Sequence, residues 1–264
     1  MKPVGTTGLT LNEKLLFEHS DPGRVGYSLP ELDVPPAELP TKLTRDEITD
    51  FPELSEIDVV RHFTRLSTWN YGVDSGLYPL GSCTMKYNPK INESVARLPG
   101  FALSHPHASQ HLTQGPLELM YRLQEALAEV SGFPGITLQP AAGAHGELAG
   151  MLVIRAWHEA KGHKKTKVLI PDTAHGTNPA TAALAGYDVV PIATANDGAL
   201  TAEEVRAHMD DDVAALMVTN PNTLGLFESH IQEICDVVHE RGGLVYCDGA
   251  NLNALMGIAR PGDM

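Results

Sequence analysis

The chain has 264 residues, of which 42% are hydrophobic and 20% are charged, so it can bury a sizeable core. Its 19 basic and 33 acidic side chains give a formal net charge of −14, which argues against nucleic acid or an anionic membrane as a general partner. No apolar run is long enough to cross a bilayer, the first residues lack the apolar stretch of a secretion signal, and the three cysteines suit reduced thiols. We therefore expect a cytoplasmic protein with no membrane or nucleic-acid partner.

Residues 1–55 are rich in proline, at positions 3, 22, 30, 35, 36, 40 and 52. Because proline lacks the N–H group that regular ladders need, this stretch predicts an extended arm. The apolar side chains of Leu15, Leu16, Phe17 and Leu29 favour an arm that wraps a surface, with a disordered tail as the alternative. Ser55 is suited to cap a helix over residues 56–66.

Residues 71–91 form a glycine- and tyrosine-rich loop without clear periodicity. From Gly115 onward the pattern becomes helical, because leucines recur every four residues on one face. We expect two parts: residues 1–114, with the arm, the first helix and this loop, and residues 115–264.

Beyond residue 130, short apolar runs alternate with helical patterns. The predicted strands are 135–140, 167–171, 188–192, 213–219 and 244–248. Two predicted helices cover 145–160 and 179–187. A third is capped by Thr201, and a fourth ends at Gly242. Strands that alternate with helices indicate an α/β fold with a mostly parallel sheet covered on both faces.

Four polar, glycine-bearing turns follow predicted strands. They are AAGAHGE (141–147), DTAHGTNP (172–179), TNPNTLGLFE (219–228) and DGAN (248–251). Ligands of open parallel sheets bind beyond the carboxyl ends of the strands, so four such turns at one edge favour a binding site.

The first of these turns suits a phosphate group. Ala142, Gly143 and Ala144 let the backbone approach closely, and the helix that follows offers N–H groups and the positive end of its dipole. The stretch is neither a P-loop nor a dinucleotide fingerprint, because it lacks Gly-Lys-Ser/Thr and the G-x-G-x-x-G spacing. Helix starts favour small residues in any case, so a purely structural role stays open.

Asp248 ends the last predicted strand, where three roles are open to it. It could cap a helix, bind a metal, or pair with the protonated ring nitrogen of pyridoxal 5′-phosphate (PLP), which keeps that ring an electron sink. His175 could stack on such a ring or bond the backbone of its own turn. Asn220, Asn222 and Thr223 could bond a ring substituent or shape an Asx turn.

Two other kinds of site compete with this reading. Cys83 could be a nucleophile, but no matching base is evident. The stretch HPHASQH (105–111) could bind zinc, but it has no cysteine partner and no suitably spaced acid. We expect neither, and no bound metal.

Several long motifs together resemble one family. They are YPLGSCTMKYNPK, LQPAAGAHGE, DTAHGTNPA, TNPNTLGLFE, and DGANLNALMG followed by RPGDM. From about residue 71 to the end, they are similar to the glycine-decarboxylating P-protein of the glycine cleavage system, specifically to subunit 2 of its two-subunit form. The resemblance implies the large domain of a PLP-dependent fold-type I enzyme (aspartate aminotransferase-like), incomplete and preceded by the N-terminal arm.

The resemblance also assigns roles to residues of this chain. His175 and Asp248 would be catalytic. The cofactor would be held by Ala142, Gly143, Ala144, His175, Thr223, Asp248 and Ala250. The loop Ser82, Cys83 and Thr84 would line the substrate pocket.

The activity that the resemblance implies is that of glycine dehydrogenase (aminomethyl-transferring). This is the PLP-dependent oxidative decarboxylation of glycine, with release of CO2 and transfer of the aminomethyl group to the lipoyl arm of H-protein. Glycine dehydrogenase subunit 1 would complete an α2β2 heterotetramer.

One departure from the family bears directly on activity. Family members carry PLP as a Schiff base on a lysine shortly after the segment that corresponds to RPGDM, whereas the last lysine here is Lys167. We therefore expect a C-terminally truncated chain that is inactive alone. The alternatives are another fold-type I PLP enzyme, such as a cysteine desulfurase or an amino acid decarboxylase, and a non-catalytic fragment that only binds subunit 1.

Overall fold

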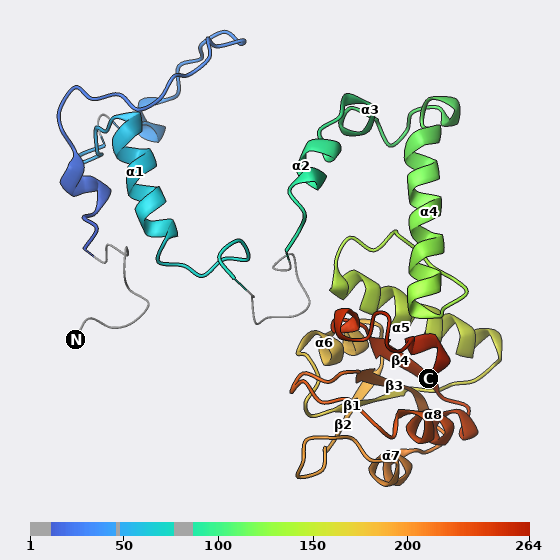
Figure 1. The fold of residues 1–264 in the computed structure, drawn as a ribbon. Coiled ribbons are helices and arrows are strands. Elements are labelled where there is room, and N and C mark those ends of the chain that lie inside the picture. The colour runs from blue at the N-terminus through green and yellow to red at the C-terminus, as the bar shows by residue number, and fades with distance from the viewer. Residues whose placement is uncertain (1–11, 46–47, 77–86) are drawn as a thin grey trace. The chain divides into compact units, whose positions relative to one another are not determined.

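The structure, a computed structural model, describes residues 12–45, 48–76 and 87–264. The chain divides into two compact units, residues 1–79 and residues 80–264 (Figure 1). Each unit has its own elements and its own internal contacts.

The first unit contains one α-helix, α1 (Glu56–Ser67), and two short 3-10 helices, η1 (Leu16–His19) and η2 (Thr41–Leu43), within its described residues. α1 begins where the sequence predicts. The Ser55 hydroxyl accepts from the Asp58 backbone N–H at 3.3 Å, and the Asp58 carboxylate accepts from the Ser55 N–H at 3.2 Å. This reciprocal pair satisfies N–H groups that a helix start otherwise leaves without partners.

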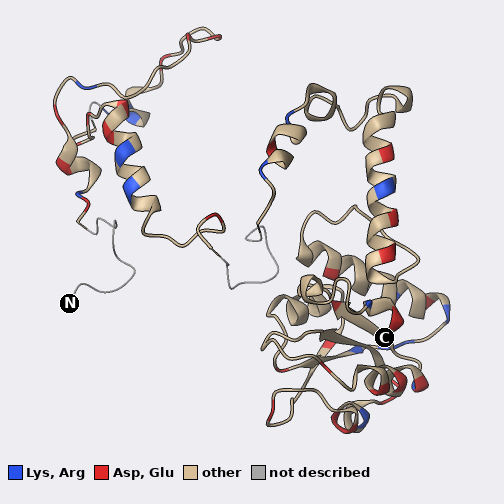
Figure 2. Ribbon diagram, viewed as in Figure 1, with Lys and Arg blue, Asp and Glu red and all other residues tan. Residues whose placement is uncertain are grey.

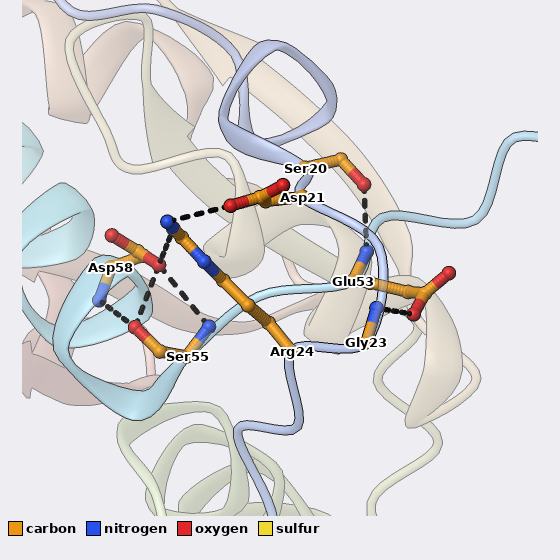
Figure 3. Close-up of polar contacts among 7 residues, drawn as sticks. All are labelled: Ser20, Asp21, Gly23, Arg24, Glu53, Ser55 and Asp58. Carbon is orange, nitrogen blue, oxygen red and sulfur yellow. Dashed lines mark hydrogen bonds and ion pairs between the residues drawn. The ribbon is translucent and has the colours of Figure 1, made fainter.

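Polar contacts tie the turn after η1 to the segment that leads into α1 (Figure 3). The Gly23 N–H donates to the Glu53 carboxylate at 2.6 Å, and the Glu53 N–H donates to the Ser20 hydroxyl at 2.9 Å. The Arg24 guanidinium lies 2.9 Å from the Asp58 carboxylate. These bonds hold residues 20–24 beside the start of α1.

A buried carboxylate, Glu13, attaches the start of the arm to α1. Its side chain is 5% exposed, and its two oxygens accept from Arg65 Nε at 2.5 Å and Nη2 at 2.7 Å. His62 Nδ1 lies 2.9 Å from the same carboxylate, and His19 Nε2 lies 3.6 Å away. The Arg65 hydrogen bonds are the main reason that the Glu13 pKa falls to about 2. Within the described part of the chain, Glu13, His19 and His62 alone are close enough to share a metal ion, but Arg65 already neutralises the carboxylate.

Several apolar side chains in the described part of the arm are exposed. Leu15, Phe17 and Leu29, side chains that the sequence offers for burial, are 66%, 63% and 77% exposed. No surface within the described residues therefore covers these three side chains.

The second unit is an α/β layer structure. Its helices are α2 (Ile91–Ala96), α3 (Pro99–Ala102), α4 (Gln114–Ser131), α5 (Gly143–Ala160), α6 (Thr177–Leu184), α7 (Ala202–His208) and α8 (Ile231–Glu240), with short 3-10 helices η3 (Gln110–Leu112), η4 (Leu252–Ala254) and η5 (Pro261–Asp263). Its strands are β1 (Lys167–Pro171), β2 (Asp188–Ile192), β3 (Val213–Thr219) and β4 (Leu244–Asp248). They form a parallel sheet in the order β2-β1-β3-β4.

Helices cover both faces of this sheet, with α5 and α6 on one side and α7 and α8 on the other (Figure 1). Neighbouring strand residues point to opposite faces, so Met217 packs with the α5 and α6 side chains while Val218 packs with those of α7 and α8. All seven residues of β3 are buried, as expected for a central strand between two helical layers.

The sequence predicts these four strands with the bounds that the structure gives them, but one expected strand is wrong. Residues 135–140 have no regular structure. A strand is defined by a ladder to a neighbour, and no described strand pairs with this segment; its Ile136 carbonyl instead accepts from the Gln124 side chain at 2.8 Å. The helices predicted over 145–160 and 179–187 begin earlier, at Gly143 and Thr177.

The helix predicted from Gly115 is α4, and it is largely uncovered. Leu119 and Leu123 on its apolar face are 57% and 47% exposed. The few charged residues of α4 are separated from one another along the helix (Figure 2). Gly132, at φ +77°, ends α4 in the left-handed conformation that favours glycine. Among the described residues, no helix is long and apolar enough to span a bilayer.

Candidate functional site

The strands of the sheet end at one edge, which we call the carboxyl edge. The loops that follow β1, β3 and β4 leave the sheet there, as expected for parallel strands. Asp248 is the last residue of β4, and His175 lies in the loop between β1 and α6. The structure brings these two predicted residues into one hydrogen-bonded network.

Asp248 is half-buried, and its two oxygens have different partners. One accepts from the Asn178 side-chain amide at 3.1 Å, and the other accepts from the backbone N–H of Ala250 at 3.1 Å. The second bond shapes the turn after β4 and positions Ala250. Asp248 does not cap the short helix that follows, because Asn251 is the N-cap residue of η4. Asp248 is not part of any metal-ligand cluster among the described residues.

Glu147 on α5 connects Asp248 to His175. This carboxylate is 5% exposed and accepts from the Thr177 hydroxyl at 2.6 Å and from the Asn178 amide at 2.9 Å. The Thr177 hydroxyl oxygen also lies 2.7 Å from His175 Nδ1.

The sequence reasoning missed Glu147, although the sequence carries a signal for it. Glu147 recurs with Met151, Ile154 and His158 at helical spacing, and these four are the buried residues of α5. An acid on the buried face of a helix needs partners, which makes it a candidate for a functional network.

His175 itself is exposed. Its Nδ1 lies 2.7 Å from the Thr177 hydroxyl oxygen and accepts a hydrogen bond from the Thr177 backbone N–H at 3.2 Å. The histidine therefore bonds within its own turn, and its ring stays accessible at the carboxyl edge.

The predicted phosphate turn forms the start of α5. Ala142 is the N-cap residue, is extended, and has no side-chain cap; its carbonyl accepts from the His145 and Gly146 N–H groups. The structure assigns no acceptor among the described residues to the N–H groups of Gly143 and Ala144. A Cβ added at Gly143 would meet no atom within 4 Å, so the space beside the helix start is open. Open space and unpaired N–H groups at a helix start fit an anion.

Internal hydrogen bonds stabilise the loop after β3. Asn222 Oδ1 accepts from the N–H groups of Leu224 at 3.0 Å and Leu226 at 3.1 Å, and its amide donates to the buried Glu228 carboxylate at 2.9 Å. Asn222 thus shapes an Asx turn, one of the two roles considered for it. The Thr223 hydroxyl donates to the Thr173 carbonyl, which ties this loop to the loop that contains His175.

Tyr246 lies on the same face of β4 as Asp248 and packs against α5. A Cβ at Gly150 of α5 would lie 2.5 Å from Tyr246 Cε2, so only glycine leaves room for this ring. Burial, and then the charges of Asp248 and Glu147, raise the Tyr246 pKa and keep its hydroxyl protonated.

One predicted feature cannot be compared with the structure, and one cavity lies on another face of the sheet. Ser82, Cys83 and Thr84, the expected substrate loop, are outside the described residues. A cavity of about 220 Å³ lies on the α8 face, where Val218, Cys235 and Cys247 line it. Of the residues that the sequence offers for contact with the cofactor, Asn220 lines this cavity, whereas His175, Thr223 and Asp248 do not.

Residues 144–256 match the family model for aminotransferase class V. The chain is 57% identical over 256 residues to a protein of Alkaliphilus oremlandii named probable glycine dehydrogenase (decarboxylating) subunit 2, with 95% of this chain and 53% of that protein covered. It is 58% identical over 258 residues to the protein of the same name from Halalkalibacterium halodurans, with coverages of 96% and 53%.

A solved structure supports the fold. A glycine decarboxylase (P-protein) of the glycine cleavage system, in inhibitor-bound form, superimposes with a TM-score of 0.60 at 21% identity, over 79% of this chain and 46% of that one. At this identity the likeness shows the fold, which is that of PLP-dependent fold-type I enzymes.

The chain spans about half the length of the curated relatives that it matches. The resemblance inferred from the motifs is confirmed: over 95% of its length, this chain is similar to glycine dehydrogenase (decarboxylating) subunit 2 and has an α/β fold with a parallel sheet.

Proposed function

We propose that the carboxyl edge of the sheet binds PLP and that the complete protein uses it to decarboxylate glycine. The observation that carries this proposal is the position of Asp248. Asp248 is half-buried at the end of β4, where it accepts a hydrogen bond from Asn178. The chain that carries it is 57% identical to a protein named probable glycine dehydrogenase (decarboxylating) subunit 2.

The residues at this edge fit the cofactor. The N–H groups of Gly143 and Ala144 would bind the phosphate, with open space beside them. Asp248 would hold the ring nitrogen protonated, His175 would stack on the ring, and Thr223 would lie near it, with Ala250 packed close by. When bound, PLP supplies an electron sink for the carbanion that loss of CO2 leaves behind.

Lys165 and Lys167, the last two lysines of the sequence, lie at the edge of the sheet opposite the proposed cofactor site. Lys167 begins β1 and pairs with Asp210 at 2.6 Å, at the opposite edge of the sheet. Lys165 donates to the carbonyls of Asp211, Val213 and Arg241 near that edge. No lysine follows Lys167 in the printed sequence. We propose that a protein consisting of residues 1–264 alone is catalytically inactive, because it cannot carry PLP covalently at this site.

The complete protein would act in the cytoplasm with two partner proteins. The lipoyl arm of H-protein would receive the aminomethyl group, and glycine dehydrogenase subunit 1 would complete an α2β2 assembly. The relatives' name, subunit 2, supports the existence of a partner chain.

The test uses the full-length subunit assembled with subunit 1 and H-protein, and it measures release of labelled CO2 from carboxyl-labelled glycine. Replacement of Asp248 by Asn removes the negative charge at the ring nitrogen, and we expect kcat to fall about 10²-fold, equivalent to about 3 kcal/mol of lost ion pairing. The matched control is Asp236→Asn, an exposed acid on α8, which should leave kcat unchanged.

Two results would contradict the proposal. One is a kcat that does not change in Asp248→Asn. The other is a free amine or a sulfur product in place of aminomethyl transfer, which would favour another fold-type I PLP enzyme.

A second candidate is that a protein limited to residues 1–264 only binds subunit 1. The exposed apolar side chains of α4, such as Leu119, favour this role. A pull-down with subunit 1 in which Leu119→Asp abolishes binding, while PLP has no effect, would support it over cofactor binding.

A further inference from the structure

One buried amide of α6 reaches acids on two other elements. Asn178 Nδ2 donates to Glu147 Oε2 on α5 at 2.9 Å and to Asp248 Oδ2 at the end of β4 at 3.1 Å. We propose that Asn178 is a positioning residue, which fixes the orientation of the Asp248 carboxylate toward the ring nitrogen of the cofactor. The consequence for the cofactor rests on the proposed function, whereas the hydrogen bonds do not.

Asp248 needs a donor on each oxygen to be held in one orientation. The Ala250 N–H donates to Oδ1 at 3.1 Å, and Asn178 donates to Oδ2. A single bond would fix one oxygen and leave the carboxylate free to turn about it, so the second bond sets the plane of the group. Asn178 is 0% exposed, and water therefore does not compete for its amide.

The amide itself is held by Glu147. This side chain is 5% exposed and lies one turn after Gly143, in the helix whose first residues are proposed to bind the phosphate. The Asn178 NH₂ group has two hydrogens, which suffice for one bond to each acid. An acid oxygen without a hydrogen accepts such a bond whether the acid is charged or neutral, so the arrangement requires no particular protonation state of Glu147.

The other end of the amide shows that packing alone does not explain Asn178. Its Oδ1 is buried and has no hydrogen-bond partner among the described residues. A buried oxygen without a partner costs free energy, and a leucine of similar shape would avoid that cost. The NH₂ group is the part of the side chain with partners, which favours a role for its two bonds. Because Asn178 is fully buried, it would act on the cofactor only through Asp248.

The experiment compares two ligands of the full-length protein: PLP and the PLP analogue in which a carbon atom replaces the ring nitrogen. Asp248 would interact with the ring nitrogen, so a misdirected carboxylate weakens binding of PLP and leaves binding of the analogue nearly unchanged. We expect the wild type to prefer PLP by about 10-fold or more, and Asn178→Leu to lose that preference. Spectral titration measures the four dissociation constants.

A crystal structure of each protein without cofactor gives a second, independent measurement. In Asn178→Leu, the Asp248 carboxylate should turn away from its wild-type orientation while the backbone of β4 stays in place. The matched control is Thr181→Val, a change of similar size at a position of α6 that is 6% exposed and gives no hydrogen bond to Asp248 or Glu147. It should keep both the orientation and the preference for PLP. If Asn178→Leu does not fold, Asn178→Ala removes the same amide without placing apolar atoms against Glu147.

The outcomes separate the two proposals. An Asp248 carboxylate that keeps its wild-type orientation without the amide would overturn the role of Asn178. So would a preference for PLP that Asp248→Asn loses and Asn178→Leu retains. A wild type that binds PLP no better than the analogue would contradict the proposed function, and the crystal structures would then decide the role of Asn178 alone.

Discussion

Gly150 of α5 and Tyr246 of β4 lie so close that a Cβ on Gly150 would be 2.5 Å from Cε2 and 2.7 Å from Cδ2 of the tyrosine ring. This contact sets the distance between α5 and the strand that ends in Asp248. The spacing of the whole network from Glu147 to Asp248 depends on it.

We predict that Gly150→Ala destabilises the second unit, because the ring must shift to admit the methyl group. Gly146→Ala is a control on the same helix, where an added Cβ meets no atom within 4 Å. Both changes gain the same helix propensity, so the difference between them isolates the packing cost, which should be about 1–3 kcal/mol. Urea unfolding followed by circular dichroism measures it. Equal free energies of unfolding for the two variants would show that the ring yields without cost.

Glu13 should titrate far below an ordinary glutamate. Hydrogen bonds from Arg65 lower its pKa from 4.5 to about 2, so the contact between Glu13 and Arg65 stabilises the first unit above about pH 4.5, and that contribution is lost as the pH falls toward 2. Carbon-13 NMR of the side-chain carboxyl group reports this pKa directly. Arg65→Gln should raise it toward 4.5, whereas Arg61→Gln, an exposed neighbour on α1, should not. A Glu13 pKa near 4.5 in the wild type would contradict the contact between Glu13 and Arg65.

Cys247 should react slowly with alkylating reagents. Burial raises the pKa of its thiol from 9.0 to about 11, so at pH 8 the thiolate fraction falls about 10²-fold. Mass spectrometry after brief iodoacetamide treatment should find Cys247 unmodified in the folded chain and modified in urea. Rapid alkylation of Cys247 in the folded chain would contradict this environment.

The sequence predicts the four strands well for a physical reason. A run such as Val213–Thr219 is apolar at nearly every position, and only a strand covered on both faces buries such a run. Residues 135–140 have fewer apolar side chains, at Ile136 and Leu138, and a strand also needs a partner for its ladder, which local sequence does not reveal. The α4 pattern likewise predicts a helix but not whether anything covers Leu119.

The sequence predicts a site residue where a reactive side chain stands at the end of a predicted strand. Asp248 combines a carboxylate with the end of a strand, and both are readable from sequence. The partners of Asp248 were not readable, because Asn178 and Glu147 lie 70 and 101 positions away in the sequence and meet it only through the packing of α5 and α6 against β4. Asn222 illustrates the converse, since its local Asx turn was one of two readings that the sequence left open.

The central claim is that Asp248 holds the ring nitrogen of PLP protonated. The most direct measurement is ¹⁵N NMR of PLP labelled at its pyridine nitrogen and bound to the full-length protein at neutral pH, for the wild type and for Asp248→Asn. We predict a protonated ring nitrogen in the wild type and an unprotonated one in Asp248→Asn. The same protonation state in both proteins, or no saturable binding of PLP to the wild type, would contradict the claim.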